Sequence, residues 1–202
     1  MPKTGGFMTA SKYNIYLDSL GCVKNLVDSE LALGLLYQAG FGLTEEPEDA
    51  DVIIVNTCGF INDAKEESIN RIIQLADLKE ERCKLLVVCG CLSQRYREEL
   101  QREMPEIDIM LGTNDYDTIV AKISTALKEK TACADFDLEA GLRQRVRITP
   151  EHTAYIKIAE GCDNNCAFCA IPGIRGGLKS RTVEDIAAEA KTLLAEGVRE
   201  LI

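Results

Sequence analysis

Three closely spaced cysteines are the residues of this chain best suited to chemistry. Cys162, Cys166 and Cys169, here called the local trio, follow the pattern C-x3-C-x2-C, with Phe168 just before the last cysteine. A [4Fe–4S] cube has four irons, so three thiolates leave one iron open to another molecule. Zinc is the alternative, but structural zinc sites take four ligands, usually in two separated pairs. The single histidine, His152, lies well before the trio.

A second set of cysteines is spread along the first half of the chain. Cys22, Cys58 and Cys91, here called the distributed trio, each follow a segment with strand character and each adjoin a glycine. Intervals of 35 and 32 residues separate them, about one strand–helix repeat each. Free cysteine is often a plain core residue, but three at equivalent positions favour a second cluster. The remaining cysteines lack this placement and are interpreted as ordinary thiols: Cys83, Cys89 and Cys133.

Strand and helix patterns alternate between these cysteines. Apolar and β-branched runs predict strands over residues 13–19, 41–44, 51–57, 84–89 and 107–111. Helical spacing predicts helices over residues 24–39, 62–78, 94–103 and 114–130, the last capped by Asn114. In the second helix the expected inward residues are Ile69, Ile72, Ile73 and Leu75. The alternation predicts an α/β fold with a doubly wound, Rossmann-like parallel sheet. Ligands of such sheets bind at the carboxyl edge of the strands, where the distributed trio would meet.

The composition changes after residue 130. Residues 131–153 run from small and acidic residues to arginines, which predicts an interdomain linker. Its arginines are interpreted as a solvated basic strand: Arg143, Arg145 and Arg147. Residues 154–159 predict a strand that leads into the local trio, and Thr182 is expected to cap a helix over residues 183–195 that ends at Gly197.

These observations predict four parts. Residues 1–12 form a disordered tail, residues 13–130 an N-terminal domain that holds the distributed trio, and residues 131–153 the linker. Residues 154–202 form the first β/α unit of a partial barrel, which cannot bury a core alone. We therefore expect this sequence to be the N-terminal part of a longer protein.

Composition limits the classes of function. The chain has 202 residues, 46% of them hydrophobic and 28% charged, as in an ordinary globular protein. No apolar run approaches the roughly 20 residues that span a bilayer, and the start of the chain has no secretory signal, so we expect a cytoplasmic protein without a membrane partner. Nine cysteines then indicate metal or redox chemistry instead of disulfides. The net charge of −10 argues against a nucleic-acid substrate and favours a basic or protein partner.

With both trios in view, the chain resembles the methylthiotransferases, which are radical S-adenosyl-L-methionine (radical SAM) enzymes. The resemblance runs from about Tyr13 to the end. Residues 20–30 (LGCVKNLVDSE) are similar to the SLGCPKNLVDSE motif of the branch that modifies an aspartate of small-subunit ribosomal protein twelve. Residues 58–68 (CGFINDAKEES) are similar to its CGFIxxAKEES motif. Val23 replaces the usual proline, which alters the stiffness of the turn, and Cys89 replaces a frequent threonine.

The resemblance implies two [4Fe–4S] clusters and SAM. The local trio would hold the cluster that cleaves SAM to a radical, and the distributed trio would hold an auxiliary cluster that carries the inserted sulfur. The product would be a methylthio group on the β-carbon of the aspartate. Phe168 would shield the first cluster or pack near the adenine, and Arg175, in a stretch similar to the family's IPxxRG motif, would meet the SAM carboxylate or the substrate. Four polar residues that flank the distributed trio would either donate to cluster sulfurs or serve turns and caps: Asn25, Asn56, Thr57 and Gln94.

Two alternatives remain open at this point. A methylthiotransferase that modifies adenosine in transfer RNA is the alternative among enzymes, and a non-catalytic iron–sulfur carrier or metal-binding module is the alternative outside them. The expected partner is the ribosomal protein or the small ribosomal subunit, while the sequence identifies neither the electron donor nor the sulfur donor. The contacts to the ribose and adenine of SAM and a substrate-binding domain are expected beyond this sequence, so the fragment alone is expected to be inactive.

Overall fold

The structure, a computed structural model, describes residues 11–128, 144–164 and 166–202. The predicted tail up to residue 10 and the linker residues 131–143, with Cys133 and Arg143, lie outside these ranges. Within them, no helix combines the length and the apolar character that a bilayer crossing requires.

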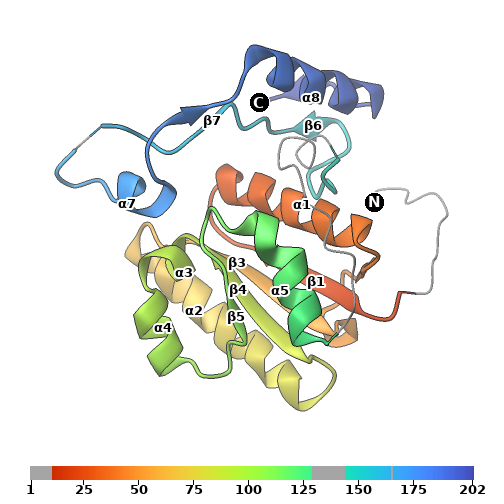
Figure 1. Ribbon diagram of the computed structural model, residues 1–202, viewed down its shortest axis with the longest axis vertical. Helices are drawn as coiled ribbons and strands as arrows, with labels where there is room; N and C mark the ends of the chain where they lie inside the picture. Colours follow the sequence, from red (N-terminus) through yellow and green to blue (C-terminus); the bar gives the residue numbers. More distant parts are fainter. Residues whose placement is uncertain (1–10, 129–143, 165) are drawn as a thin grey trace.

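A five-stranded parallel sheet forms the centre of the first part of the chain (Figure 1). Its strands are β1 (Asn14–Ser19), β2 (Gly42–Leu43), β3 (Val52–Thr57), β4 (Leu85–Gly90) and β5 (Ile109–Met110). They lie in the order β2-β1-β3-β4-β5. The order reverses between β1 and β3, and open α/β sheets bind their ligands outside the carboxyl ends of the strands at such a switch point. The prediction of an α/β fold with a Rossmann-like parallel sheet is confirmed.

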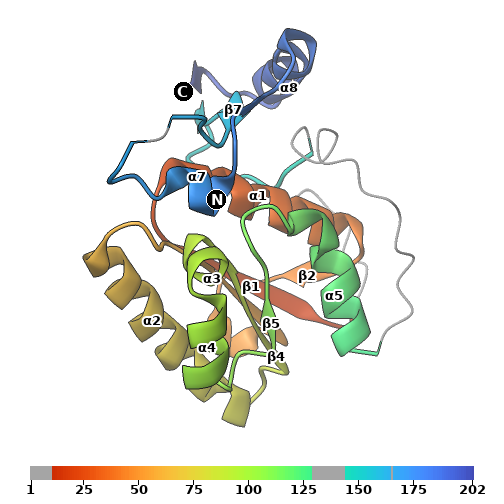
Figure 2. The same ribbon diagram turned by 60° about the vertical axis from the view of Figure 1, so that its left-hand side comes forward.

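Helices cover both faces of the sheet (Figures 1 and 2). One face carries α1 (Val23–Gln38) and α5 (Ile119–Ala126), and the other carries α2 (Asn62–Ala76), α3 (Cys91–Arg95) and α4 (Arg97–Glu103).

The central strand β3 is buried on both sides. Val52 and Ile54 join the core under α1 and α5, while Ile53 and Val55 join the core under α2, α3 and α4. All four side chains have 0% exposure. Enclosing each one stabilises the fold by about 1.5–3 kcal/mol relative to an exposed position. The β-branched run therefore makes the rigid centre on which the adjoining loops are mounted.

Three of the predicted helices differ from the observed ones. Ile72 and Leu75 of α2 are buried, but Ile69 and Ile73 are 36% and 49% exposed, so the prediction that all four face inward is wrong. Ser68 shares the buried face of α2, and a helical period from Ser68 reaches Ile72 and Leu75 and turns the neighbouring isoleucines outward. Ile69 and Ile73 instead line a surface cavity of about 430 Å³ beside α4.

The last helix of the sheet domain starts later than predicted. A 3₁₀ turn, η3 (Tyr116–Thr118), precedes α5. Asp115 closes this turn, because its Oδ2 accepts from Gly112 N at 2.8 Å and its carbonyl accepts from Thr118 Oγ1 at 2.7 Å. The prediction that Asn114 caps the helix is wrong. The predicted helix over residues 94–103 is divided at Tyr96, which has φ −126° and ψ 36°. Two further 3₁₀ turns are η1 (Pro47–Asp49) and η2 (Asp77–Glu80).

The part of the chain that carries the local trio contains short strands. The single strand predicted over residues 154–159 is two strands, β6 (Thr153–Ala154) and β7 (Ala159–Glu160). Parallel pairing joins β6 to β9 (Glu200–Leu201), and antiparallel pairing joins β7 to β8 (Lys179–Ser180). The short helix α7 (Ile171–Arg175) follows the local trio.

Helix α8 (Val183–Ala195) connects β8 to β9 and confirms its predicted bounds. Thr182 Oγ1 accepts from Asp185 N at 3.2 Å, so the predicted cap is present. Gly197 ends the helix with φ +96°, a conformation that favours glycine. The elements β6, α8 and β9 make one parallel β–α–β unit, and a barrel built from such units stays a prediction.

Arg145 joins this part to the sheet domain. Its side chain is 1% exposed, and its guanidinium lies 3.2 Å from Glu30 Oε2 of α1 and 3.1 Å from Glu189 Oε1 of α8. The prediction of a solvated basic strand is therefore wrong for Arg145. Gly34 of α1 permits the close approach, because a Cβ there would lie 2.8 Å from Arg145 Cα.

Candidate metal centre

The fold brings the three loops of the distributed trio to one edge of the sheet. Cys22 begins α1 shortly after β1, Cys58 follows β3 directly, and Cys91 follows β4 as the first residue of α3. Thr57 pairs with Gly90 in the parallel register, so Cys58 and Cys91 leave neighbouring strands at the same level. Their positions at the carboxyl edge agree with the sequence prediction, and their role as ligands stays a prediction.

The thiols of this trio lie near one another. A Cβ on Gly21 would lie 3.2 Å from Cys58 Sγ, so the turn before Cys22 touches Cys58. Burial raises the pKa of the Cys91 thiol, the guanidinium of Arg175 opposes this change, and Cys58 and Cys22 raise the pKa further. Cys22 and Cys58 therefore lie close enough to Cys91 to contribute to the raised pKa of its thiol.

An iron–sulfur cluster and a single metal ion require different arrangements of donors. In the described part of the chain, no group of three or more Cys, His, Asp or Glu side chains is arranged to hold one metal ion. In a cube each thiolate binds a different iron, which requires a wider arrangement. Cys58 and Cys91 are buried and Cys22 is exposed, so a bound cluster would be reached from the Cys22 side.

Asn25 connects the loops of the distributed trio. Its side chain is fully buried, and Nδ2 donates to Leu20 O at 3.0 Å and to Thr57 O at 2.9 Å. Its Oδ1 lies 3.6 Å from Cys91 Sγ. Asn56 supports this arrangement, because its Nδ2 donates to Asn25 O at 2.8 Å. The sequence predicts that these asparagines either donate to cluster sulfurs or serve turns and caps. In the structure their amide groups donate to the backbone carbonyls of Leu20, Thr57 and Asn25, and these hydrogen bonds connect the loops.

Arg175 reaches the distributed trio from the other part of the chain. The residue is 4% exposed, and its Nη1 contacts Asp28 Oδ2 at 3.0 Å and Glu160 Oε2 at 2.9 Å. Its Nη2 contacts Asn25 Oδ1 at 2.6 Å and Cys91 Sγ at 3.8 Å. Burial alone would lower the pKa of this guanidinium, but Asp28 and Glu160 outweigh it and raise the pKa. The role predicted for Arg175 toward SAM or the substrate stays a prediction.

Sequence reasoning missed the acidic partners of Arg175. Asp28 lies on α1 inside the motif LGCVKNLVDSE. The signal that could have identified it is a carboxylate on the buried face of a helix, where it needs a cationic partner. Glu160 precedes the local trio in β7. Lys157 also bridges both carboxylates, with Nζ 2.6 Å from Asp28 Oδ1 and 2.9 Å from Glu160 Oε2. Arg175 and Lys157 therefore pair with the two carboxylates between the two trios, and Lys24 adds a longer contact of 3.9 Å to Glu160 Oε1.

The local trio lies in a more open loop. Cys162 N donates to Gly176 O at 3.0 Å, and Cys169 N donates to Cys166 O at 3.0 Å. Cys166 is exposed, and the Phe168 residue is 94% exposed. The role predicted for Phe168 beside the cluster or the adenine stays a prediction.

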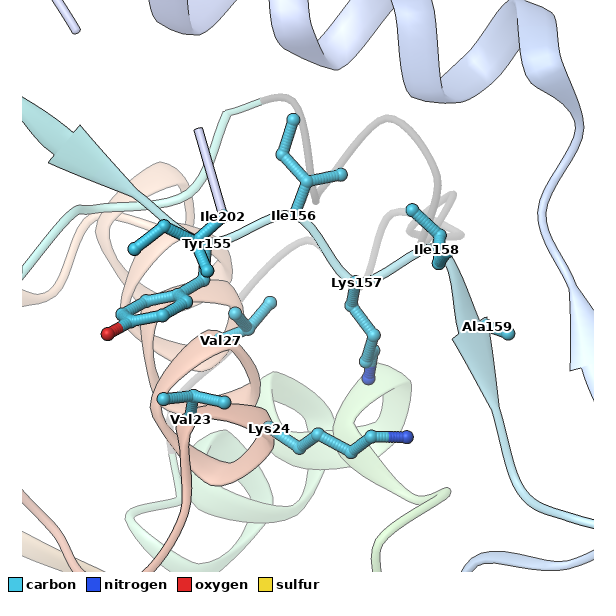
Figure 3. Close-up of a pocket in the computed structure, with 9 residues that line it drawn as sticks. All are labelled: Val23, Lys24, Val27, Tyr155, Ile156, Lys157, Ile158, Ala159 and Ile202. Carbon is cyan, nitrogen blue, oxygen red and sulfur yellow. The ribbon is translucent and has the colours of Figure 1, made fainter. Parts of the chain in front are cut away.

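A cavity of about 330 Å³ lies between α1 and residues 155–159 (Figure 3). Its walls are mainly aliphatic, and Lys24 and Lys157 contribute two ammonium groups. Burial lowers the pKa of Lys157, but Asp28 and Glu160 raise it more strongly, so this lysine stays charged. The cavity thus lies between the helix that begins after Cys22 and the segment that leads to the local trio, and the two lysines at its edge both contact Glu160.

Comparison with known proteins finds a family match in the sheet domain and relatives over most of the chain. Residues 14–112 match the model of the uncharacterized protein family UPF0004. The chain is 52% identical over 189 residues to the ribosomal protein uS12 methylthiotransferase RimO of Anaeromyxobacter sp. (strain K), which covers 93% of this chain and 40% of that protein. It is 50% identical over 202 residues to RimO of Clostridium tetani, covering 96% of this chain and 44% of that protein.

A third relative, RimO of Geobacter sulfurreducens, is 46% identical over 204 residues, again covering 96% of this chain and 44% of the relative. The chain thus spans about two fifths of the length of the curated relatives it matches. These matches confirm the predicted resemblance to the methylthiotransferases: residues 14–112 are similar to the UPF0004 family, and most of the chain is similar to about two fifths of the length of proteins named ribosomal protein uS12 methylthiotransferase RimO.

Proposed function

We propose that the protein is a ribosomal protein uS12 methylthiotransferase that adds a methylthio group to the β-carbon of an aspartate. The observation that carries the proposal is the convergence of the distributed trio at the switch point of the sheet, in a chain 46% to 53% identical to relatives named for this activity. Its partner is uS12 or the small ribosomal subunit, and its place is the cytoplasm.

The donor sets divide between two [4Fe–4S] clusters. The distributed trio would hold the auxiliary cluster, and the local trio would hold the cluster that binds SAM. When bound, the clusters and SAM supply one-electron cleavage of SAM, a carbon radical and a transferable sulfur. An unactivated C–H bond requires such chemistry, and no side chain of the protein provides it.

The residues of the chain position these groups. The parallel register of β3 and β4 sets the separation of Cys58 and Cys91, and Asn25 holds the loops that precede Cys22 and Cys58. The exposed Cys22 leaves one side of the distributed trio accessible to a substrate. Asp28 and Glu160 pair with Arg175 and Lys157, so these charged side chains between the trios have partners of opposite sign.

Anaerobic reconstitution of the full-length protein tests the donor sets. We expect about eight irons per chain, and about four in Cys58→Ser or in Cys166→Ser. Cys83→Ser is the matched control, because Cys83 is buried outside both trios and its loss should leave the iron content unchanged. A wild-type protein with four irons or fewer that forms no 5′-deoxyadenosine from SAM would reject the two-cluster proposal.

Mass spectrometry of uS12 tests the substrate. A strain that lacks the gene should lose the methylthio group of the aspartate and regain it on complementation with the wild-type gene, but not with the Cys58→Ser variant. An unchanged methylthio-aspartate signal in the deletion strain would reject the assignment. Loss of methylthioadenosine from transfer RNA in that strain would support the transfer-RNA branch instead.

A further inference from the structure

We propose that Arg175 is a positioning residue of the distributed trio, which it reaches through Cys91 and Asn25, although it follows the local trio in sequence. The inference rests on the proposed function for the identity of the auxiliary cluster. Its geometric part depends only on the contacts of the protein itself.

The guanidinium of Arg175 is linked to all three cysteine loops, directly at Cys91 and through Asn25 at the other two. Arg175 Nη2 lies 3.8 Å from Cys91 Sγ and 2.6 Å from Asn25 Oδ1. Asn25 Nδ2 in turn holds Leu20 O, ahead of Cys22, and Thr57 O, ahead of Cys58. Displacement of the guanidinium would therefore disturb the three loops together.

Iron binding strengthens this role of Arg175. A Cys91 thiol can donate to Asn25 Oδ1, since the two atoms lie 3.6 Å apart. A cysteine that binds iron has lost its proton, so Asn25 Oδ1 then keeps Arg175 as its donor. The N–H that points at Cys91 Sγ becomes a charge-assisted contact to a thiolate. Hydrogen bonds to cluster sulfurs and nearby charge are among the factors that set the reduction potential.

The position of Arg175 is well supported by its surroundings. Asp28 and Glu160 neutralise its charge, and Lys157 shares both carboxylates. The backbone of α7 is also anchored, because Thr113 Oγ1 donates to Ile174 O at 2.7 Å. Figures 1 and 2 show α7 beside α3, the helix that begins at Cys91. Such an enclosed, paired side chain holds one orientation, as a positioning residue must.

Variants that keep one trio separate the two clusters. In full-length protein with the local trio replaced by alanines, Arg175→Met should lower the midpoint potential of the remaining cluster and change its electron paramagnetic resonance spectrum. Arg175→Lys, which keeps the charge, should restore part of the shift. In protein with the distributed trio replaced by alanines, Arg175→Met should leave the potential unchanged.

Arg181→Met is the matched control. Arg181 lies in the same segment and pairs, partly buried, with Asp185 and Glu189, and its contacts do not include the distributed trio. It should leave both potentials unchanged. A shift caused by Arg175→Met only in the protein that keeps the local trio, or an equal shift caused by Arg181→Met, would overturn the inference.

Hydrogen exchange of the metal-free protein gives a readout that needs no cluster. Arg175→Met should accelerate amide exchange roughly tenfold or more in the loops around Cys22 and Cys58 and in residues 171–177, because local opening becomes easier. Arg181→Met should leave the two cysteine loops protected. Failure of the distributed trio to assemble iron would contradict the proposed function alone, and unchanged exchange in the Cys22 and Cys58 loops would contradict the inference alone.

Discussion

The distributed trio is mounted on three strands of one sheet, whereas the local trio lies in a single loop. Register and burial determine where Cys58 and Cys91 emerge. A few backbone contacts, such as that from Cys162 N to Gly176 O, shape the loop of the local trio, and Cys166 is exposed. The contrast teaches that a site assembled from distant parts of the sequence can be more deeply enclosed than one built from neighbouring residues. Four substitutions or conditions test this contrast.

Arg145→Met should have the largest effect on stability. It leaves the buried carboxylate of Glu30 without its guanidinium and removes one partner of Glu189. Breaking a buried pair in this way costs about 3–5 kcal/mol, measurable by urea unfolding of the metal-free protein. Arg102→Met, at an exposed pair with Glu103, is the control and should produce no measurable change. A loss of only a few tenths of a kcal/mol for Arg145→Met would mean that the trio-bearing parts are not coupled through it.

Gly90→Ala should disrupt the distributed trio and spare the local trio. Gly90 has φ +95°, and a Cβ there would lie 2.3 Å from Asn56 Oδ1 and 2.6 Å from Thr57 O. Overpacking with backbone strain should cost about 3 kcal/mol or more. Gly40→Ala is the matched control, because Gly40 has φ +91° with open space around it, and it should cost about 1 kcal/mol. Equal unfolding free energies for the two variants would show that packing at Gly90 does not hold Cys91.

Thr182→Ala should have a smaller effect, confined to the part that carries the local trio. It removes the oxygen that accepts from Asp185 N and should destabilise α8 by about 1 kcal/mol. Hydrogen exchange should accelerate in residues 183–195 and stay unchanged in β3 and β4. Thr182→Ser keeps the hydroxyl and should behave as wild type. Faster exchange throughout the sheet would contradict a local role.

The smallest of the four effects is expected from acid, which should lower the free energy of unfolding by protonating Asp51. Burial would raise the pKa of Asp51, but hydrogen bonds from Lys84 and Asn14 N outweigh it, so the pKa is lowered on folding. The stabilisation is therefore present above the ordinary aspartate pKa of about 3.9 and is lost as the pH falls through the lower folded value. Urea unfolding should show wild type losing its advantage over Asp51→Asn across this range. A difference that grows toward acid would reverse the assigned direction.

Short-range patterns made the fold predictable. The run over residues 51–57 is β-branched and ends at Cys58, so both the strand and the position of the cysteine followed from a few neighbours. The cap at Thr182 depends on a residue three positions away. The helical pattern of α2 was harder to interpret, because its isoleucines alone fit more than one choice of buried face. Only the buried Ser68 shows that the buried face passes through Ile72 and leaves Ile69 and Ile73 exposed.

Long-range pairing could not be predicted. Arg175 reaches Asp28 and Asn25 across 147 and 150 residues, and Arg145 finds Glu30 of α1 and Glu189 of α8. No local pattern distinguishes these arginines from solvated ones. The break between β6 and β7 has a similar origin, because Lys157 between them extends to Asp28. These residues lie where the part that carries the local trio contacts the sheet domain, and the two parts are far apart in the sequence.

The spacing of the distributed trio has a consequence for the order of biosynthesis. The local trio is complete once eight consecutive residues, 162–169, have left the ribosome. The distributed trio does not exist until β1, β3 and β4 have paired, and such non-local parallel pairing is slow. Arg175 emerges later still. A nascent chain would thus present bare thiols at Cys22 and Cys58 before their site is formed, and the proposed cluster could be loaded there only after the sheet has folded.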